Sequence, residues 1–154
     1  MNKGHNLRPP KIEIPDMGIF ALEDGRYLQT VQIQNQEVSF ALFPPNKGEL
    51  TDKWIQKMSV RCRRFIERFD SQVEVICENV RKLCREYEMY ENVEIPWSNE
   101  ELLADLKWYD VKFSDSVYSK IECCTEPQTG PMSNFSLIIG FDEEMVFDYV
   151  HFDG

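Results

Sequence analysis

The sequence predicts an α+β fold, in which a mostly antiparallel sheet of about six or seven strands packs against a long central helical region. Two observations lead to this prediction. Both ends of the chain contain short runs that alternate between apolar and polar residues, whereas apolar residues in 51–91 recur every three or four positions. Strands on either side of one helical segment are typical of a domain in which helix and sheet form separate layers.

The N-terminal part divides into an arm and a meander. Three prolines within "RPPKIEIPD" predict an extended arm over residues 1–16. Beyond the arm, Asp24-Gly25 is a turn signal between apolar runs, and Asn35-Gln36 is the expected second turn. Pro44-Pro45 ends the third strand of this meander. A single α+β domain is therefore expected over residues 17–154.

The central region carries a continuous apolar stripe. Its members are Trp54, Met58, Cys62, Phe65, Phe69, Val73, Ile76, Val80, Leu83 and Tyr87. Their mean spacing of about 3.7 residues matches the helical period of roughly 3.6, and Thr51 or Asp52 provides an N-cap. Because the stripe keeps its phase through Asp70-Ser71, one long helix and two helices divided at Ser71 both stay open.

A short helix and further strands follow. Ser98 and Glu101 have the spacing of a capping box, so "PWSNEELLADLKWYD" predicts a second helix. The next run, "WYDVKFS", predicts a strand with Trp108, Asp110 and Lys112 on one face. The runs "VYSKIECC", "FSLIIGF" and "MVFDYVHF" predict three more strands, and "TEPQTGPMSN" predicts a loop.

The final stretch, "FDEEMVFDYVHFDG", gathers five acids around His151 and raises the question of a metal or catalytic site. Strand alternation places Met145, Phe147, Tyr149 and His151 on one face and Val146, Asp148, Val150 and Phe152 on the other. Both faces are largely apolar, as in a strand covered on both sides. Asp148 then faces away from His151, so we assign no metal and no catalytic residue here.

The cysteines fit core positions better than a chemical site. Cys62 lies on the helical stripe, Cys77 and Cys84 flank it, and Cys123-Cys124 point to opposite faces of a strand. None has the CxxC or histidine spacing of a zinc site. The glycines are isolated, so the chain has no phosphate-binding loop. No cofactor is therefore predicted.

Charge is concentrated in the C-terminal part of the chain. Residues 92–154 hold 3 basic and 13 acidic groups, which equals the whole net charge of −10. Such a field repels nucleic acid and acidic membranes and attracts basic partners. The basic run "RCRRFIERF" is interleaved with acids, which predicts a solvated helix face with local ion pairs. The N-terminus has no apolar signal segment, so a cytoplasmic location is expected.

The order of elements resembles a group of small bacterial domains of unknown function found near polymorphic toxin genes, some of which are thought to be immunity proteins. The similar features are the Trp97 segment before a helix with an acidic start, the aromatic strand after it, and the terminal pair "FSLIIGFDEEMVFDYVHFDG". In that group the last strand often carries Gly-His after an aromatic residue, whereas here Asp148-Tyr149-Val150-His151 follows Phe147. The resemblance implies an inhibitor that binds one toxin tightly.

We therefore expect a non-enzymatic binding protein with a cognate, basic toxin such as a nuclease as its partner. Carboxylates complement a basic surface, and aromatic anchors supply affinity. The expected partner-binding residues are Glu122, Glu126, Asp142, Glu143, Glu144, Asp148, Trp97 and Trp108. The alternative is a metal-dependent hydrolase that uses C-terminal carboxylates with His151. The oligomeric state is left undefined by the sequence.

Overall fold

The structure is a computed structural model that describes residues 8–45, 48–86, 98–115, 121–129, 133 and 135–153. Its elements are β1 (Lys11–Ile14), β2 (Gly18–Glu23), β3 (Arg26–Ile33), β4 (Gln36–Phe43), α1 (Asp52–Glu86), α2 (Asn99–Asp105), β5 (Leu106–Ser114), β6 (Ile121–Pro127), β7 (Ser136–Phe141) and β8 (Phe147–Asp153). The predicted α+β class is confirmed, with eight strands among the described residues in place of six or seven.

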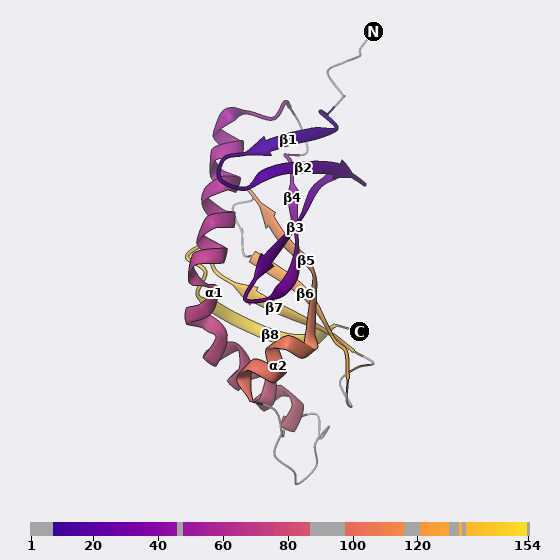
Figure 1. Cartoon of the computed structure of the whole chain (residues 1–154), viewed down its shortest axis with the longest axis vertical. Helices are drawn as coiled ribbons and strands as arrows, with labels where there is room; N and C mark the ends of the chain where they lie inside the picture. Colours follow the sequence, from indigo (N-terminus) through magenta and orange to yellow (C-terminus); the bar gives the residue numbers. More distant parts are fainter. Residues whose placement is uncertain are drawn as a thin grey trace.

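The sheet consists of two antiparallel meanders that lie side by side (Figure 1). Strand order follows sequence order from β1 to β8, and every neighbouring pair is antiparallel except β4 and β5. Parallel neighbours require a long crossover connection, and the chain between β4 and β5 contains α1 and α2. We call β1–β4 the first meander and β5–β8 the second meander.

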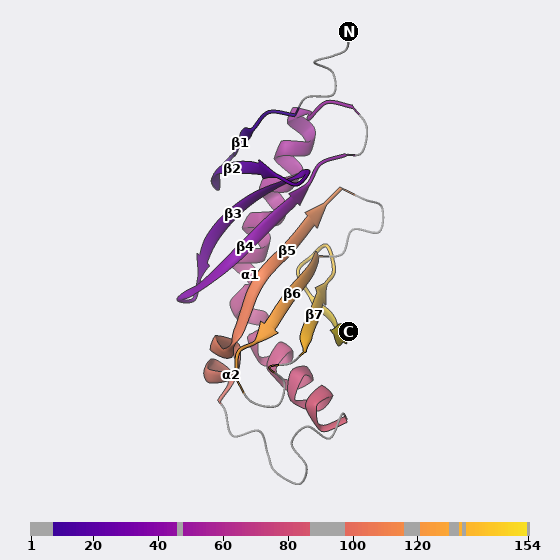
Figure 2. The same ribbon diagram turned by 90° about the vertical axis from the view of Figure 1, so that its right-hand side faces the viewer.

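α1 is one continuous helix of 35 residues that lies along one face of the sheet (Figure 2). Its N-cap is Thr51, whose hydroxyl accepts the Trp54 N–H at 3.0 Å. Ser71 does not begin a second helix, because its hydroxyl donates to the Arg68 carbonyl one turn earlier. The described members of the apolar stripe are buried except Val73, which is partly buried. Tyr87 lies outside the described residues.

Phe65 stands at the centre of the core between α1 and both meanders. Its ring lies edge-on to Phe40 of β4 with a centroid distance of 5.4 Å. It also lies edge-on to Phe113 of β5 and Phe141 of β7, each at 5.9 Å. Edge-to-face aromatic pairs add stability beyond the apolar area they bury. One helical side chain therefore connects the two meanders through a shared core.

Of the three hairpin turns of the first meander, the two that contain only two residues use left-handed backbone. Asp24-Gly25 form the first turn, as predicted, with φ of 53° and 82°. The second turn is Gln34-Asn35, with φ of 49° and 66°, and not the predicted Asn35-Gln36. Gln36 already pairs with Ile33 as the first residue of β4. A two-residue hairpin of type I′ needs positive φ at both central positions. Gln34 therefore adopts a left-handed backbone conformation that glutamine does not favour, and for this reason its residue type did not predict the turn.

Part of the segment predicted as an arm belongs to the sheet. Ile12 and Ile14 of β1 are buried, and the whole strand pairs with β2. The Tyr27 hydroxyl donates to the Pro9 carbonyl at 2.8 Å, which holds the entry to β1 against β3. The prolines predicted an extended path, and Pro15 limits the length of the strand because it has no N–H to donate.

A β-bulge corrects the face assignment for β5. The register with β6 shifts between Trp108 and Asp110, so Tyr109 is the extra residue. Trp108 consequently lies on the helix side with Val111 and Phe113, and not with Asp110 and Lys112. A bulge inverts the alternation beyond it, and a strict period of two cannot reveal that inversion.

A second bulge corrects the assignment for β8. Phe141 pairs with Phe147 while Gly140 pairs with Tyr149, so Asp148 is the extra residue. Phe147 therefore shares the core side with Val150 and Phe152, and Tyr149 and His151 lie on the opposite side. β8 is an edge strand whose residues are exposed or half-buried, so the prediction of a strand covered on both faces is wrong.

α2 begins as predicted, whereas β6 is longer than predicted. The capping box of α2 is confirmed, since the Glu101 N–H donates to Ser98 Oγ at 3.1 Å and the Ser98 N–H to Glu101 Oε1 at 3.2 Å. β6 runs on to Pro127, three residues into the predicted loop. Thr125 explains this extension, because its buried hydroxyl donates to the Leu137 carbonyl at 3.0 Å.

Candidate partner-binding surface

Among the described residues, no helix covers the side of the second meander opposite α1 (Figure 2). Side chains on this side form cross-strand rows from β5 to β8. We call this surface the open face and define it by Tyr109, Asp110, Lys112, Glu122, Cys124, Glu126, Ile138, Gly140, Tyr149 and His151. It contains Glu122 and Glu126, two of the carboxylates predicted to bind a partner.

Tyr149 lies flat across the sheet because its neighbour is a glycine. A Cβ atom at Gly140 would stand only 2.1 Å from Tyr149 Cε1, so no larger residue fits beneath the ring. The Tyr149 hydroxyl reaches over β7 and donates to Glu122 Oε2 at 3.1 Å. Burial, and then the nearby Glu122 charge, raise the pKa of Tyr149 to about 12. His151 stacks on this ring with a centroid distance of 5.5 Å. The phenol therefore stays neutral and fixed at neutral pH.

The carboxylates of the open face differ in their partners. Asp110 pairs with Arg26 of β3 at 2.9 Å, and Glu122 lies 3.7 Å from the Lys112 ammonium. Glu126 is exposed, and within the described parts of the chain no cation stands at ion-pair distance from its carboxylate. Its cross-strand partner on β5 is Lys107, which lies beyond ion-pair distance, so the Glu126 carboxylate stays open to an external cation.

Small and apolar side chains form the floor of the open face. Cys124 and Ile138 are only 7% and 5% exposed, although no described helix lies over them. Tyr109, the bulged residue, is 36% exposed, and burial raises its pKa while a side-chain hydrogen bond with Ser136 acts in the opposite direction. The result is a flat surface of aromatic rings beside carboxylates.

The acidic turn, Asp142 to Glu144, does not belong to the open face. Asp142 Oδ1 accepts the backbone N–H groups of Glu144 and Val146 at 2.9 and 3.0 Å, which shapes the turn. Arg64 donates to the Glu143 carbonyl at 3.0 Å, and Arg68 donates to the Glu144 carbonyl at 2.6 Å. The structure therefore uses these acidic residues to attach the β7–β8 hairpin to α1. The three residues are exposed, and their role in partner binding stays a prediction.

The three remaining residues predicted to bind a partner, Trp108, Asp148 and Trp97, are not among the residues that define the open face. Trp108 is 1% exposed and packs edge-on against Phe69 of α1 at 5.3 Å. A fully buried indole offers no contact surface, so the assignment of Trp108 to a partner interface is corrected. Asp148 is exposed at the β8 bulge, and Trp97 lies outside the described residues. Sequence reasoning left Tyr149 out of the site, and the only signal for it was Gly140 on the neighbouring strand.

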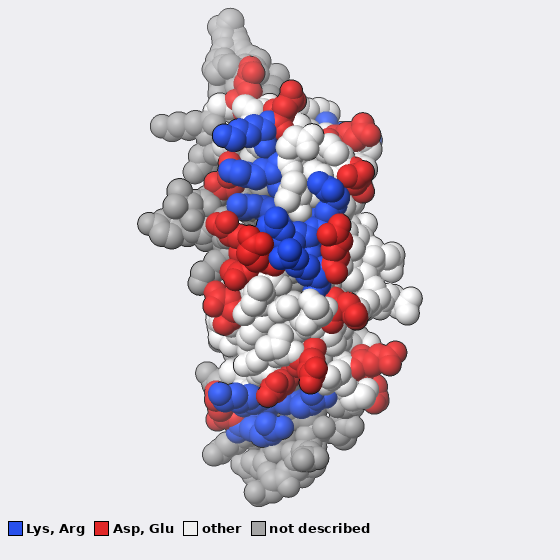
Figure 3. All heavy atoms as spheres, turned by 90° about the vertical axis from the view of Figure 1, so that its left-hand side faces the viewer, with Lys and Arg blue, Asp and Glu red and all other residues white. Residues whose placement is uncertain are grey.

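The arginines of "RCRRFIERF" connect α1 to the sheet. Figure 3 shows the α1 face, where basic side chains gather and acidic ones border them. The contacts are Arg61 with the Ser114 carbonyl, Arg63 with Asp16 at 3.6 Å, and Arg64 and Arg68 with the Glu144 carboxylate at 3.7 and 3.4 Å. The predicted local pairs within the helix are replaced by contacts to strand ends and turns, which lie close to α1 only in the folded chain.

Among the described residues there is neither a reactive cysteine nor the metal site that the hydrolase alternative requires. Cys62, Cys77, Cys84, Cys123 and Cys124 are all buried, and none of them forms a disulfide bond. Burial raises the pKa of Cys77 and Cys84 to about 11, which disfavours the nucleophilic thiolate. Within the same described ranges, no group of three or more His, Cys, Asp or Glu side chains is placed to hold a metal ion.

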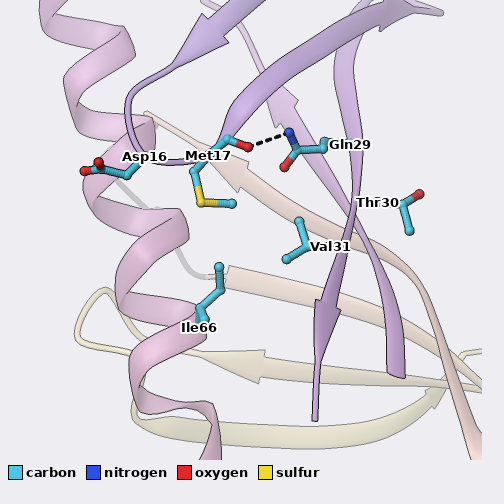
Figure 4. A pocket seen from close by; sticks show the side chains of 6 residues that line it. All are labelled: Asp16, Met17, Gln29, Thr30, Val31 and Ile66. Carbon is cyan, nitrogen blue, oxygen red and sulfur yellow. Dashed lines mark hydrogen bonds between the residues drawn. The ribbon is translucent and has the colours of Figure 1, made fainter. Parts of the chain in front are cut away.

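Two shallow pockets lie beside α1. The first, of about 340 Å³, is lined by Asp16, Met17, Gln29, Thr30, Val31 and Ile66 (Figure 4). There the Gln29 carboxamide donates to the Met17 carbonyl at 2.7 Å, which fixes the β1–β2 turn. The second, of about 410 Å³, is lined by Glu74, Glu78, Arg81, Arg85 and Asn99. Neither lining set contains a nucleophile beside a general base, so the open face is the stronger candidate.

Comparison with protein-family models, curated proteins and solved structures found no match to this chain. In the part of the chain that the structure describes, no helix combines the length and apolar character needed to cross a membrane.

Proposed function

We propose that this chain is a non-enzymatic binding protein that docks a basic protein partner on its open face. Most concretely, we propose a bacterial immunity protein that neutralises a cognate toxin in the cytoplasm. One observation supports this proposal above all others. The ring of Tyr149 lies beside Glu122 and the ring of Tyr109 lies beside Glu126, on a sheet surface that no described helix covers. Tyrosines supply contact area at low entropic cost, and carboxylates select a basic partner.

The charge distribution favours a basic partner. From Ile121 to the C-terminus the chain has no Lys or Arg, and its acids are Glu122, Glu126, Asp142, Glu143, Glu144, Asp148 and Asp153. A nuclease must present Lys and Arg to the phosphates of its substrate. Such a surface is complementary to the second meander, and the attraction raises the association rate over long range. Carboxylates that occupy a phosphate-binding cleft would block the substrate.

Glu126 and Tyr109 are the two side chains that we expect to contribute most to binding. Glu126 gives up no described ion pair when it meets a partner's cation. Tyr109 already has part of its surface buried, so ordering it costs little. A partner arginine can stack on the Tyr109 ring and reach the Glu126 carboxylate at the same time.

Co-purification with the product of the adjacent gene tests the proposal. A tagged chain should retain that product, and its co-expression should restore the growth of cells that produce the toxin. An unrelated basic nuclease is the control for attraction by charge alone, and it should not be retained. A neighbouring product that is no toxin, or that does not bind, would contradict the immunity function.

A further inference from the structure

We infer that the outer edge of β8 accepts an extended basic segment of the partner as an added strand of the sheet. This inference rests on the proposed function and specifies how the partner binds. In such β-augmentation, main-chain hydrogen bonds provide affinity and the alternating side chains provide selectivity. Three observations support it: the asymmetry of the two sheet edges, the direction of the β8 backbone groups, and the charge of the second meander.

The two edge strands of the sheet are not equally protected. β1 has only 4 residues and lies between Pro9-Pro10 and Pro15, which cannot donate to a further strand. β8 has 7 residues and contains no proline. Proteins protect sheet edges with short strands and prolines because an exposed edge is a template for pairing with another chain. The first edge is closed by these means. β8 has neither of them: α1 covers its start, where Gln72 accepts the outward Phe147 N–H, so the part of the edge open to a further strand lies beyond that contact.

The hydrogen bonds at the start of β8 show which backbone groups point outward. The Phe147 N–H donates to Gln72 Oε1 of α1 at 2.8 Å and not to its pairing residue Phe141. Hydrogen-bonded and non-hydrogen-bonded pairs alternate along an antiparallel ladder. The next pair in the register is Gly140 with Tyr149, and the one after it is Ile139 with Val150. The Val150 N–H therefore points away from β7, on an edge that no described strand occupies.

The side chains of β8 define the chemistry of the added strand. Val150 and Phe152 pack against the core on the helix side, while Tyr149 and His151 lie on the open face. A strand added beside β8 would place apolar residues against Val150 and Phe152 on the helix side. On the open face it would place Lys or Arg residues near Tyr149 and Glu122. A second copy of this chain does not meet these requirements, because it would bring two acidic second meanders together.

A peptide probe separates this binding mode from the proposed function. The probe is a short capped peptide of alternating valine and arginine, and its control replaces each arginine by glutamate. Added to the full chain, the arginine peptide should bind saturably and slow amide hydrogen exchange at Val150 by about tenfold or more. Val150→Pro, which removes the outward N–H, should weaken binding by about tenfold or more. Val150→Thr keeps that N–H and should stay within about twofold of the wild type.

The outcomes distinguish the two claims. Absence of saturable binding overturns strand addition, and so does binding that leaves Val150 exchange unchanged. Sedimentation that reveals a dimer lost in Val150→Pro also overturns it, because the occupant of the edge is then a second copy. A peptide that binds as expected, together with failed co-purification of the neighbouring gene product, contradicts the proposed function and leaves the edge site in place.

Discussion

The two meanders share a topology and a core but differ on the surfaces that the core does not use. Both contribute alternating apolar residues to the layer beneath α1. On its side opposite α1, the first meander carries small and uncharged residues at its centre, such as Leu28, Thr30 and Ser39, and charged residues of both signs around them, namely Lys11, Glu13, Glu23, Arg26 and Glu37; it carries no tyrosine there. The second presents the carboxylates and tyrosines of the open face. Folding requires only the core-facing residues, so the surface features confined to one meander are the best candidates for function.

The shared core predicts that the two meanders unfold together. Phe65→Ala removes a fully buried ring that contacts both, so the free energy of unfolding should fall by about 3–5 kcal/mol. Chemical denaturation followed by far-ultraviolet circular dichroism measures this loss. Val60→Ala, at an exposed position of the same helix, is the control and should change stability by about 0.5 kcal/mol or less. Two separate unfolding transitions in the wild type would show that the meanders are independent.

The flat open face depends on a glycine in the second meander. Gly140→Ala forces the Tyr149 ring away from the sheet and should destabilise the protein by about 1–3 kcal/mol. Combining it with Tyr149→Ser removes the obstructing ring, so the double variant should lose less stability than the sum of the single variants. Additive losses in thermal or chemical denaturation would show that the clash is relieved elsewhere.

The contact between Tyr149 and Glu122 predicts a smaller, pH-dependent effect. Glu122→Gln removes a charge that raises the pKa of Tyr149, so this pKa should fall from about 12, yet stay above 10 because burial is the larger cause. The neutral phenol contributes stability that is complete below pH 10 and is lost as the pH rises towards about 12. NMR titration of the ring resonances measures the shift, with Tyr149→Phe for assignment. An unchanged pKa would show that Glu122 has no influence on the ring.

Much of the fold followed from local patterns in the sequence. The helical stripe, the Ser98–Glu101 capping box and the Asp24-Gly25 turn are local signals, and all three are confirmed. The bulges at Tyr109 and Asp148 are not local signals. They depend on the register between two strands, which one strand's alternation does not encode. The face of every residue on one side of each bulge was therefore misassigned.

The candidate site was only partly predictable, for the same physical reason. Glu122 and Glu126 were both predicted as partner-binding residues and both lie on the open face, but Glu126 fell in the predicted loop and joins Glu122 only because β6 runs on to Pro127. Glu144 is engaged by arginines from α1, a contact between segments 76 residues apart for Arg68. The role of Tyr149 depends on Gly140 in the strand beside it. Pairwise contacts of this kind exist only once the sheet has formed.

The affinity of the adjacent gene product for two charge-reversal variants tests the central claim most directly. Glu126→Lys changes the open face, whereas Glu67→Lys makes the same change in charge at an exposed position on α1. Calorimetry at one ionic strength should show Glu126→Lys weakening binding by about tenfold or more, which corresponds to about 1.4 kcal/mol. Glu67→Lys should stay within about twofold of the wild type. Equal losses in both variants, or a larger loss in Glu67→Lys, would contradict docking on the open face.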